Sequence, residues 1–199
     1  KVLGSFSRDL RNDVRSREEA GVTIRTGEDG DVGRIYEAMV DRYREQGQSQ
    51  PVSREFIEDL LAAVGDRARI YVAESDSGRF LSGMIVLYAD NTAYNWKGGT
   101  KPAEIDTSVS VNNLLHWQII EDIIEDPDLE SVSTYDFYTA NNERLSRYKS
   151  SFNGSLATYY TVESNGVPMA VAKTAYRNAL STSIPGSKQF VIGNLLKDK

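Results

Sequence analysis

The sequence contains no cysteine and only one histidine, His116, among 199 residues. The lack of cysteine excludes disulfides, thiolate nucleophiles and zinc–thiolate sites, and a single histidine excludes a multi-histidine metal cluster. We therefore expect no metal, so that any catalysis must use lysine, carboxylates, hydroxyl groups or backbone dipoles. For His116 itself, a structural or surface role and a general-base role are both open.

Long apolar runs are also missing. No segment approaches the roughly 18 consecutive apolar residues of a membrane span, and the N-terminus lacks the apolar core of a signal peptide. The 29 acidic and 23 basic side chains give a net charge of −6, which disfavours binding to duplex nucleic acid. We expect a soluble, cytoplasmic protein. The excess of Arg over Lys and of Asp over Glu also hints at a high-salt environment, although ordinary acidic proteins overlap this range.

The remaining composition fits one folded domain, because hydrophobic residues make up 40% of the chain and charged residues 26%, enough to offset chain entropy. Phe6, Leu10 and Val14 stand four apart, which predicts a thin amphipathic helix. We expect three parts: a helix entering from a missing N-terminal domain and docking on it (1–20), the domain itself (21–180), and a loosely ordered tail (181–199).

Periodicity and turn signals then predict the order β-α-α-β-β-β-α-β-α-β. We expect Asp29 or Asp31 to cap the first helix of this domain, Ser53 the second and Asn141 the helix that ends at residue 152. The central helix should start near Ser108. The expected strands are 22–25, 68–74, 80–89, 92–96, 131–137 and 155–163, and the expected helices are 29–46, 54–64, 108–124, 141–152 and 169–180.

This order resembles the GNAT acyltransferase fold. The resemblance implies an α/β protein with a mixed, mostly antiparallel sheet flanked by helices. It also implies that the fourth strand and the strand after the central helix splay apart. Such a gap exposes backbone N–H groups and a helix N-terminus, which bind anions and carbonyl groups.

Three segments, TAYNWKGGT, NNLLHWQIIEDII and TYDFYTANNERLSRYKSSFNGSLATYY, resemble the C-terminal half of Fem-type aminoacyltransferases. RYKSSFNG is the most specific of the matching stretches, and the match spans roughly residues 20–163. Members of that family commonly hold a pair of GNAT-like domains, which implies that this chain is the second of two. The matching residues are Tyr94 to Gly99, Leu114, Leu115, Trp117, Tyr135, Asp136, Phe137, Tyr148, Lys149, Phe152 and Gly154.

One departure concerns the acyl donor. The acetyl-coenzyme A fingerprint of ordinary GNAT enzymes is Arg/Gln-x-x-Gly-x-Gly/Ala, whereas the segment after Trp96 reads KGGTKPAEIDT. Many Fem-like proteins also lack this fingerprint. The resemblance therefore leaves the donor open between an acyl-coenzyme A and an aminoacyl-tRNA.

Lys149 is the first catalytic candidate, because the resemblance implies that it lies near the transferred acyl group and stabilises the developing oxyanion. On this interpretation its replacement abolishes transfer and leaves thermal stability nearly unchanged. The alternative is a solvated helix lysine. Arg144 and Arg147 stand beside it at helical spacing, so the helix could instead be a basic patch for a phosphorylated substrate or a salt-bridged surface.

Asp136 is the second catalytic candidate. Strand alternation puts its carboxylate on the face opposite Tyr135 and Phe137, where it could orient an amine or accept its proton. The alternative is structural: Asp136 would cap the next helix or pair with Lys149 or an arginine.

Further residues are expected to bind substrate. Small glycines allow a ligand close to the backbone, and amide side chains in the first turns of the central helix can bond a ligand, although a flexible loop and helix-end satisfaction explain the same residues. The candidates are Trp96, Gly98, Gly99, Thr100, Ser110, Asn113, Tyr138 and Arg147.

Taken together, these features favour an acyl- or aminoacyltransferase that acts on an amine, with the segment from Gly98 to Ser110 binding the donor and Trp96 on the acceptor side. One rival is a non-catalytic GNAT-like module that binds a ligand or partner domain. The other is a tRNA-end binder, in which basic residues and strand aromatics such as Tyr94 and Tyr160 stack bases.

Overall fold

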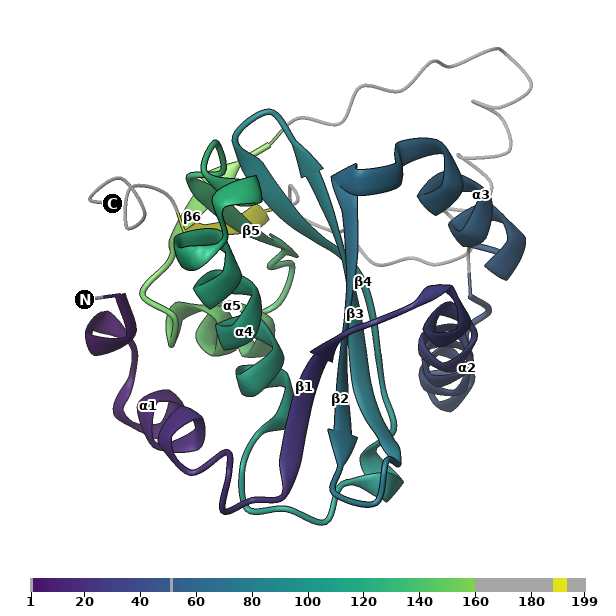
Figure 1. The fold of residues 1–199 in the computed structure, drawn as a ribbon, viewed down its shortest axis with the longest axis horizontal. Coiled ribbons are helices and arrows are strands. Elements are labelled where there is room, and N and C mark those ends of the chain that lie inside the picture. Colours follow the sequence, from purple (N-terminus) through teal and green to yellow (C-terminus); the bar gives the residue numbers. More distant parts are fainter. Residues whose placement is uncertain (1, 51, 160–187, 193–199) are drawn as a thin grey trace.

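A seven-stranded sheet in the order β1-β2-β3-β4-β5-β7-β6 organises the protein (Figure 1). The computed structural model describes residues 2–50, 52–159 and 188–192, and the expected helix over 169–180 lies outside them. The strands are β1 (Val22–Thr26), β2 (Ala68–Ser75), β3 (Phe80–Ala89), β4 (Thr92–Thr100), β5 (Thr134–Thr139), β6 (Ser155–Thr158) and β7 (Lys188–Ile192). The α-helices are α1 (Arg8–Arg15), α2 (Asp29–Glu45), α3 (Arg54–Val64), α4 (Val111–Glu125) and α5 (Glu143–Ser150).

The order from β1 to β6 confirms the predicted α/β architecture. Among the described strands, β4 and β5 run parallel and every other neighbouring pair is antiparallel. The short β2–β3 and β3–β4 turns produce the predicted meander, because they leave no room for a crossover. No helix in the described part of the chain is long and apolar enough to cross a membrane.

Helices cover both faces of the sheet (Figure 1). On one face, α4 packs its buried Leu115 and Ile119 into a large cluster that also holds Tyr135 and Phe137 of β5. On the other face, α2 and α3 contribute Ile35 and other apolar side chains to a smaller cluster over β2 and β3. We refer to these as the α4 face and the α2 face.

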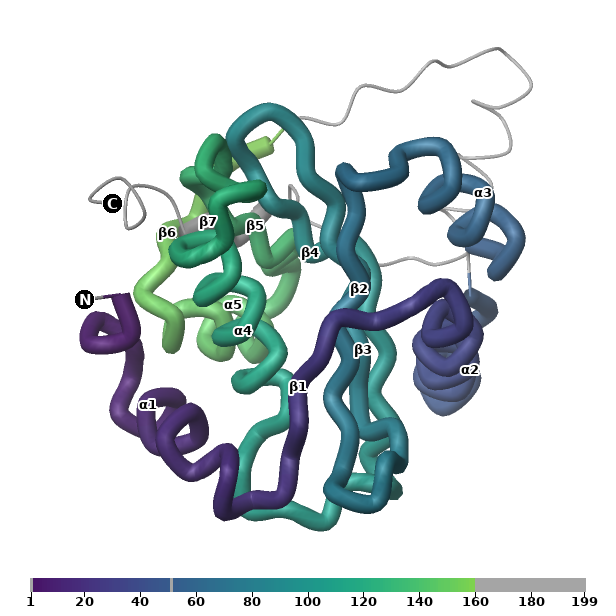
Figure 2. The backbone as a smooth tube through the Cα atoms, viewed as in Figure 1, coloured from purple at the N-terminus to yellow at the C-terminus, as the bar shows by residue number. Residues whose placement is uncertain are grey.

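The N-terminal helix packs differently from the prediction. Phe6 and Leu10 are buried in the cluster of the α4 face, and the ring of Phe6 meets those of Trp117 and Phe152 edge-on. Figure 2 shows α1 beside α4. The apolar stripe of this segment therefore packs on the α4 face of the described domain, and a domain on its N-terminal side stays a prediction.

Several helix and strand boundaries differ from the predicted ones. Glu28, not Asp29 or Asp31, is the N-cap of α2 and forms a reciprocal capping box with Asp31. The helix α5 is capped by Asn142 and not Asn141, since Asn142 accepts the N–H of Leu145. The central helix α4 begins at Val111, after the N-cap Ser110, and not near Ser108.

Two strand differences bear on the candidate site. Lys97 to Thr100 extend β4 and do not form a loop, because they continue the ladder with β3. Residues 188–192, which the sequence places in the loose tail, form β7 between β5 and β6 (Figure 1, yellow). The sequence does not predict β7, since its partners are far away in the chain.

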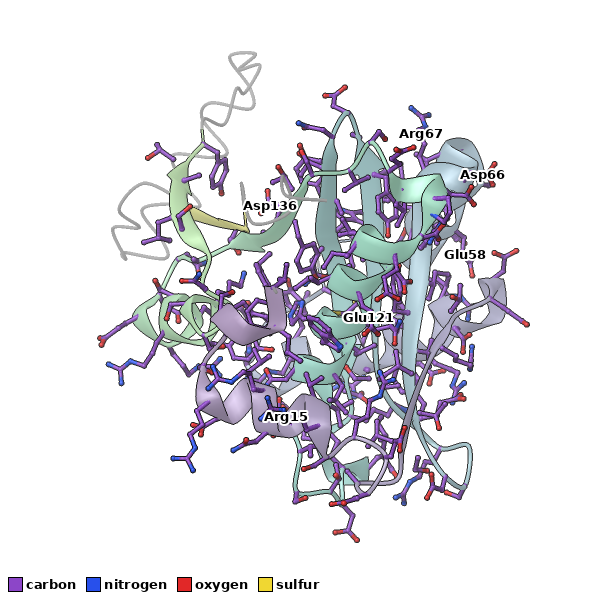
Figure 3. The ribbon with its side chains drawn as sticks, turned by 60° about the vertical axis from the view of Figure 1, so that its left-hand side comes forward. Arg15, Glu58, Asp66, Arg67, Glu121 and Asp136 are labelled. Atoms are coloured by element: carbon purple, nitrogen blue, oxygen red, sulfur yellow. The ribbon has the colours of Figure 1, made fainter. Side chains whose placement is uncertain are left out.

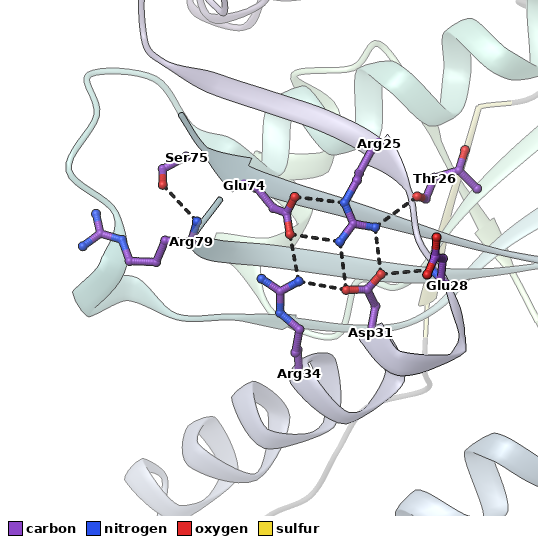
Figure 4. Close-up of polar contacts among 8 residues, drawn as sticks. All are labelled: Arg25, Thr26, Glu28, Asp31, Arg34, Glu74, Ser75 and Arg79. Carbon is purple, nitrogen blue, oxygen red and sulfur yellow. Dashed lines mark hydrogen bonds and ion pairs between the residues drawn. The ribbon is translucent and has the colours of Figure 1, made fainter. Parts of the chain in front are cut away.

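A cluster of four charged side chains ties β1, β2 and α2 together (Figure 4). Arg25 bonds both Asp31 and Glu74, and Arg34 bonds the same two carboxylates at 2.8–2.9 Å. The hydrogen bond from Arg25 is the main reason that the pKa of Asp31 falls to about 2. The network fixes the start of α2 over the edge strand β1.

Gly99 provides the first test of this packing. A Cβ atom there would lie 2.3 Å from the carbonyl oxygen of Ile35 and 2.9 Å from Cβ of Ala38, both on α2. We expect Gly99→Ala to lower the free energy of unfolding by about 1–3 kcal/mol. The matched control is Gly30→Ala in α2, where a Cβ meets nothing within 4 Å. This change should raise the free energy of unfolding by at most about 1 kcal/mol, because alanine favours a helix more than glycine does. Urea unfolding of both variants checks this, and equal stabilities would contradict it.

Candidate functional site

The strands β4 and β5 pair over a short stretch and then part. Their parallel register ends with Tyr94 opposite Asp136, although β4 continues to Thr100 and β5 to Thr139. A register shift between β3 and β4 falls one residue later, between Asn95 and Lys97, and leaves Trp96 unopposed. We call this place, where β4 after Tyr94 leaves β5 after Asp136, the divergence point.

Lys149 supplies a physical reason for the divergence. Its Nζ donates to the carbonyl oxygens of Phe137 at 2.5 Å, Tyr138 at 3.3 Å and Thr139 at 2.5 Å. The end of β5 therefore turns its carbonyls toward α5 and not toward β4. The side chain is 8% exposed, and burial lowers the pKa of Lys149 to about 8, with the carboxylate of Asp136 acting in the opposite direction.

Asp136 lies at the divergence point and is 3% exposed. Its Oδ1 accepts the N–H of Tyr138 at 2.7 Å, which supports a turn where Tyr138 has φ of 62°. Burial raises the pKa of Asp136 to about 6, partly offset by the Tyr138 N–H and by Lys149. Figure 3 shows Asp136 on β5, well apart from the labelled Glu121 of α4. Burial thus brings the pKa of this carboxyl group closer to neutral pH than that of an exposed aspartate.

His116 is part of the core on the α4 face. Its Nδ1 lies 2.7 Å from the hydroxyl of Tyr135, and its ring contacts those of Phe137 and Phe152. Burial lowers the pKa of His116 to about 3, and the charge of Lys149 adds to this effect. Of the two roles left open by the sequence, the geometry supports the structural one.

The two glycines of β4, Gly98 and Gly99, lie in different surroundings. Gly99 is buried and lets α2 approach, so its lack of a side chain serves packing and not a ligand. Gly98 is exposed on the adjacent position, and a Cβ there would lie 3.2 Å from the carbonyl oxygen of Gly83. Of the two glycines, only Gly98 is therefore exposed.

The first turn of α4 is fastened to β3 and β4 by a hydroxyl and amide cluster. Oδ1 of Asn112 accepts from Ser82 Oγ at 2.8 Å and from Thr100 Oγ1 at 3.2 Å, and the two hydroxyls lie 2.9 Å apart. Ser110 is exposed and makes no side-chain cap bond. The first amides of α4 thus sit at a fixed position beside the end of β4, with no acidic residue in the first turn.

Two other predicted residues lie elsewhere. Asn113 donates to Asp13 of α1 at 2.6 Å, so it joins two helices. Arg147 is 80% exposed, pairs with Glu143 at 2.7 Å and lines a pocket of about 420 Å³ on α5 with Arg144. The structure does not bring these side chains to the divergence point.

Trp96 and Tyr138 stand closer to the divergence point. Trp96 packs against the cluster of the α2 face, and the ammonium of Lys97 lies 5.5 Å from its ring centre. Tyr138 is 46% exposed and follows Asp136 by two residues. Tyr94 is the direct partner of Asp136. The sequence names Tyr94 among the residues that match Fem-type enzymes and among the strand aromatics, but the strand register that places it beside Asp136 is not visible in the sequence.

The model of a GNAT acetyltransferase domain matches residues 4–150 of the sequence. The chain belongs to the GNAT acetyltransferase family. A search of curated protein sequences finds no match. Among solved structures, a spermidine N-acetyltransferase from Vibrio cholerae in complex with CoA and spermine is 11% identical with a TM-score of 0.52, covering 86% of this chain and 95% of the other.

Two further GNAT neighbours support the same fold. An acetyltransferase from Streptococcus agalactiae is 11% identical with a TM-score of 0.56 and covers 86% of this chain and 97% of its own. A possible acetyltransferase from Clostridium difficile is 13% identical with a TM-score of 0.56 and covers 73% and 98%. At these identities the similarity establishes the GNAT fold alone.

Replacing Lys149 tests how much its hydrogen bonds to the carbonyls of β5 contribute to stability. We expect Lys149→Met to lower the free energy of unfolding by about 1–3 kcal/mol, because buried carbonyl oxygens lose their donor. This replaces the expectation from sequence that stability would barely change. The control is Lys101→Met, whose half-exposed ammonium lies 3.7 Å from Glu37 and should cost less than about 1 kcal/mol. Equal melting temperatures for the two variants would refute the structural role.

Asp136 generates a pH-dependent stability prediction. Because its pKa is raised in the folded state to about 6, the folded protein holds this proton more tightly than the unfolded chain, and stability is lost as the pH rises from about 4 through 6. Asp136→Asn keeps the acceptor for Tyr138 and removes this loss. We expect the difference in the free energy of unfolding, variant minus wild type, to increase by about 1–3 kcal/mol when the pH is raised from about 4 to about 7.5. Urea unfolding at both pH values measures it, and a difference independent of pH would contradict it.

Proposed function

We propose that the protein transfers an acyl group from an activated donor to an amine, with the reaction taking place at the divergence point. The observation that carries this proposal is the buried carboxyl group of Asp136 at the last β4–β5 pair. Its pKa of about 6 leaves it ionised at neutral pH and able to accept a proton. Membership of the GNAT family supports acyl transfer as the reaction class.

The donor would bind along the end of β4. Gly98 is exposed there, and Thr100 is held by the cluster that fastens α4. The N–H groups of Val111 and Asn112 precede the first bonds of α4 to the Ser110 carbonyl, and such helix-start N–H groups favour an anionic group. One structural neighbour was solved with CoA, and the likeness to Fem-type enzymes in RYKSSFNG supports an aminoacyl donor as the alternative.

The chemical step needs one proton acceptor. The amine nitrogen attacks the carbonyl carbon of the donor, a C–N bond forms, and the bond from carbon to the leaving sulfur or oxygen breaks with its electron pair. The proton lost by the amine passes to the carboxylate of Asp136, directly or through a water molecule. Trp96 and Tyr138 would line the acceptor side, since each follows the Tyr94–Asp136 pair by two residues along its strand.

Lys149 takes a different role from the one that the resemblance implies. Its ammonium is occupied by the carbonyls of β5, so we propose it as a positioning residue that keeps β5 turned away from β4. Its charge also favours the ionised form of Asp136. Oxyanion stabilisation would then depend on backbone N–H groups at the divergence point.

The acceptor side extends across the α2 face. One row of paired residues crosses four neighbouring strands, from Ala68 through Leu87 and Tyr94 to Asp136. Ala68 lines a pocket of about 470 Å³ between β1, β2 and α3, whose lining includes apolar residues and the carboxylates of Asp29 and Glu58. These features suit an amine that carries a hydrocarbon segment, and one structural neighbour was solved with spermine.

A paired GNAT-like domain at the N-terminal side, as in Fem-type proteins, is part of this proposal. Arg147 and Arg144 line a separate pocket on α5, where a phosphorylated group would meet two guanidinium groups. A non-catalytic ligand-binding module is the second candidate, because the full occupation of Lys149 by backbone carbonyls removes the one lysine that the resemblance assigns to chemistry.

Asp136→Asn distinguishes the two functions. If Asp136 accepts the amine proton, this variant should lose about 10²- to 10⁴-fold in kcat/KM. The rate of the wild type should rise with pH through the pKa of about 6, and this limb should vanish in the variant. The assay uses the full-length protein with acetyl-coenzyme A or an aminoacyl-tRNA mimic and a panel of amines that includes spermidine.

The control for this test is Asp128→Asn, an exposed carboxylate in the turn after α4, which should leave the rate unchanged. Turnover by Asp136→Asn equal to that of the wild type would exclude Asp136 as the base. The absence of turnover with every donor would favour the non-catalytic module.

A further inference from the structure

Within the described part of the chain, a few buried side-chain polar atoms have no hydrogen-bond partner. Buried polar groups are nearly always paired, so each such atom requires an explanation. Asn95 is the one among them that lies on the sheet beside the divergence point. The atoms are both amide atoms of Gln50, Oδ1 of Asn95, Oδ1 of Asn113 and Oη of Tyr148.

The register fixes the direction of the Asn95 side chain. Asn95 follows Tyr94, the last residue of β4 that pairs with β5, and it is opposite Val86 of β3. The side chain of Val86 belongs to the cluster of the α4 face, and directly opposed residues of antiparallel strands share a face. The amide of Asn95 therefore points to the α4 face at the start of the divergence.

The position also explains why the protein leaves Oδ1 without a partner. Beyond Asp136, the carbonyls of β5 are turned toward Lys149, and β5 no longer pairs with β4. Asn95 as a whole is only partly buried, whereas its Oδ1 is shielded from solvent. Oδ1 of Asn95 is thus a shielded acceptor directly after the last β4–β5 pair, and an N–H group of a ligand would supply its missing partner.

We propose that Oδ1 of Asn95 accepts a hydrogen bond from an N–H group of the substrate bound at the divergence point. This inference rests on the proposed function, since it takes that place to be the substrate site. An amide oxygen only accepts, so the partner must be a donor. Two sources carry this chemistry: the amide N–H groups in the pantetheine arm of a coenzyme A donor, and the amine N–H of the acceptor.

The test combines ligand binding with stability of the free protein. Asn95→Leu removes the acceptor and preserves volume, and Asn95→Asp keeps an acceptor without offering a donor. Asn91→Leu, at an exposed asparagine of the β3–β4 turn, is the matched control. Calorimetric titration of the full chain with coenzyme A, with ADP, which lacks the pantetheine arm, and with spermidine gives the dissociation constants, and thermal unfolding without ligand gives the melting temperatures.

We expect Asn95→Leu to weaken binding of coenzyme A or of spermidine by roughly three- to tenfold and to leave ADP binding unchanged. Loss confined to coenzyme A identifies the donor arm, and loss confined to spermidine identifies the acceptor amine. Asn95→Asp should restore most of the affinity. The melting temperature of free Asn95→Leu should equal or exceed that of the wild type, because the change removes an unpaired buried acceptor.

The proposal is overturned if Asn95→Leu leaves all three dissociation constants unchanged, or if the wild type binds neither coenzyme A nor spermidine. A lower melting temperature of Asn95→Leu with unaltered binding would instead assign Asn95 to the fold. These outcomes do not depend on turnover. Failure of the inference can therefore be separated from failure of acyl transfer, which Asp136→Asn tests.

Discussion

The hydrogen bonds from one ammonium group to the end of β5 are the interaction on which the arrangement of the site depends. Lys149 gives the carbonyls of three successive residues, from Phe137 to Thr139, a donor inside the protein. Buried carbonyl groups need such a partner, and a sheet would ordinarily provide it from the adjacent strand. With Lys149 in this role, β5 can end its pairing with β4 after three residue pairs without leaving its backbone unsatisfied.

The same arrangement sets the charge state of the site. Lys149 and Asp136 are both buried, and each stabilises the charged form of the other. Burial nevertheless dominates and moves both pKa values toward neutrality, which is where acid–base chemistry is most effective. The residue that shapes the backbone thus also tunes the carboxyl group that we propose as the base.

The strand β4 is held from both faces, which makes the opposite side of the divergence point rigid. On the α2 face, the helix α2 rests directly on Gly99. On the other face, Asn112 ties the first turn of α4 to Ser82 and Thr100. The N-terminus of α4 and the end of β4 therefore have fixed relative positions, as binding of a donor along β4 would require. Gly99 and Thr100, which the sequence predicts to bind substrate, thus serve to hold β4 in place.

Local patterns in the sequence determined the elements of this protein and their order. The period of α4, the turns of the meander and the cap at Ser53 depend on neighbours within a few residues. The bounds of α3 and β3 were predicted as the structure has them, and those of α4 and β4 were off by a few positions. The fold class followed from that order. Only the tertiary structure decided that Phe6 and Leu10 belong to this core, that Gly99 receives a helix and not a ligand, that Lys149 serves backbone carbonyls, and that Asn95 has an unpaired oxygen. Each of these depends on strand register and on contacts between distant segments, and a local sequence pattern carries no information about which distant group will arrive beside a given side chain.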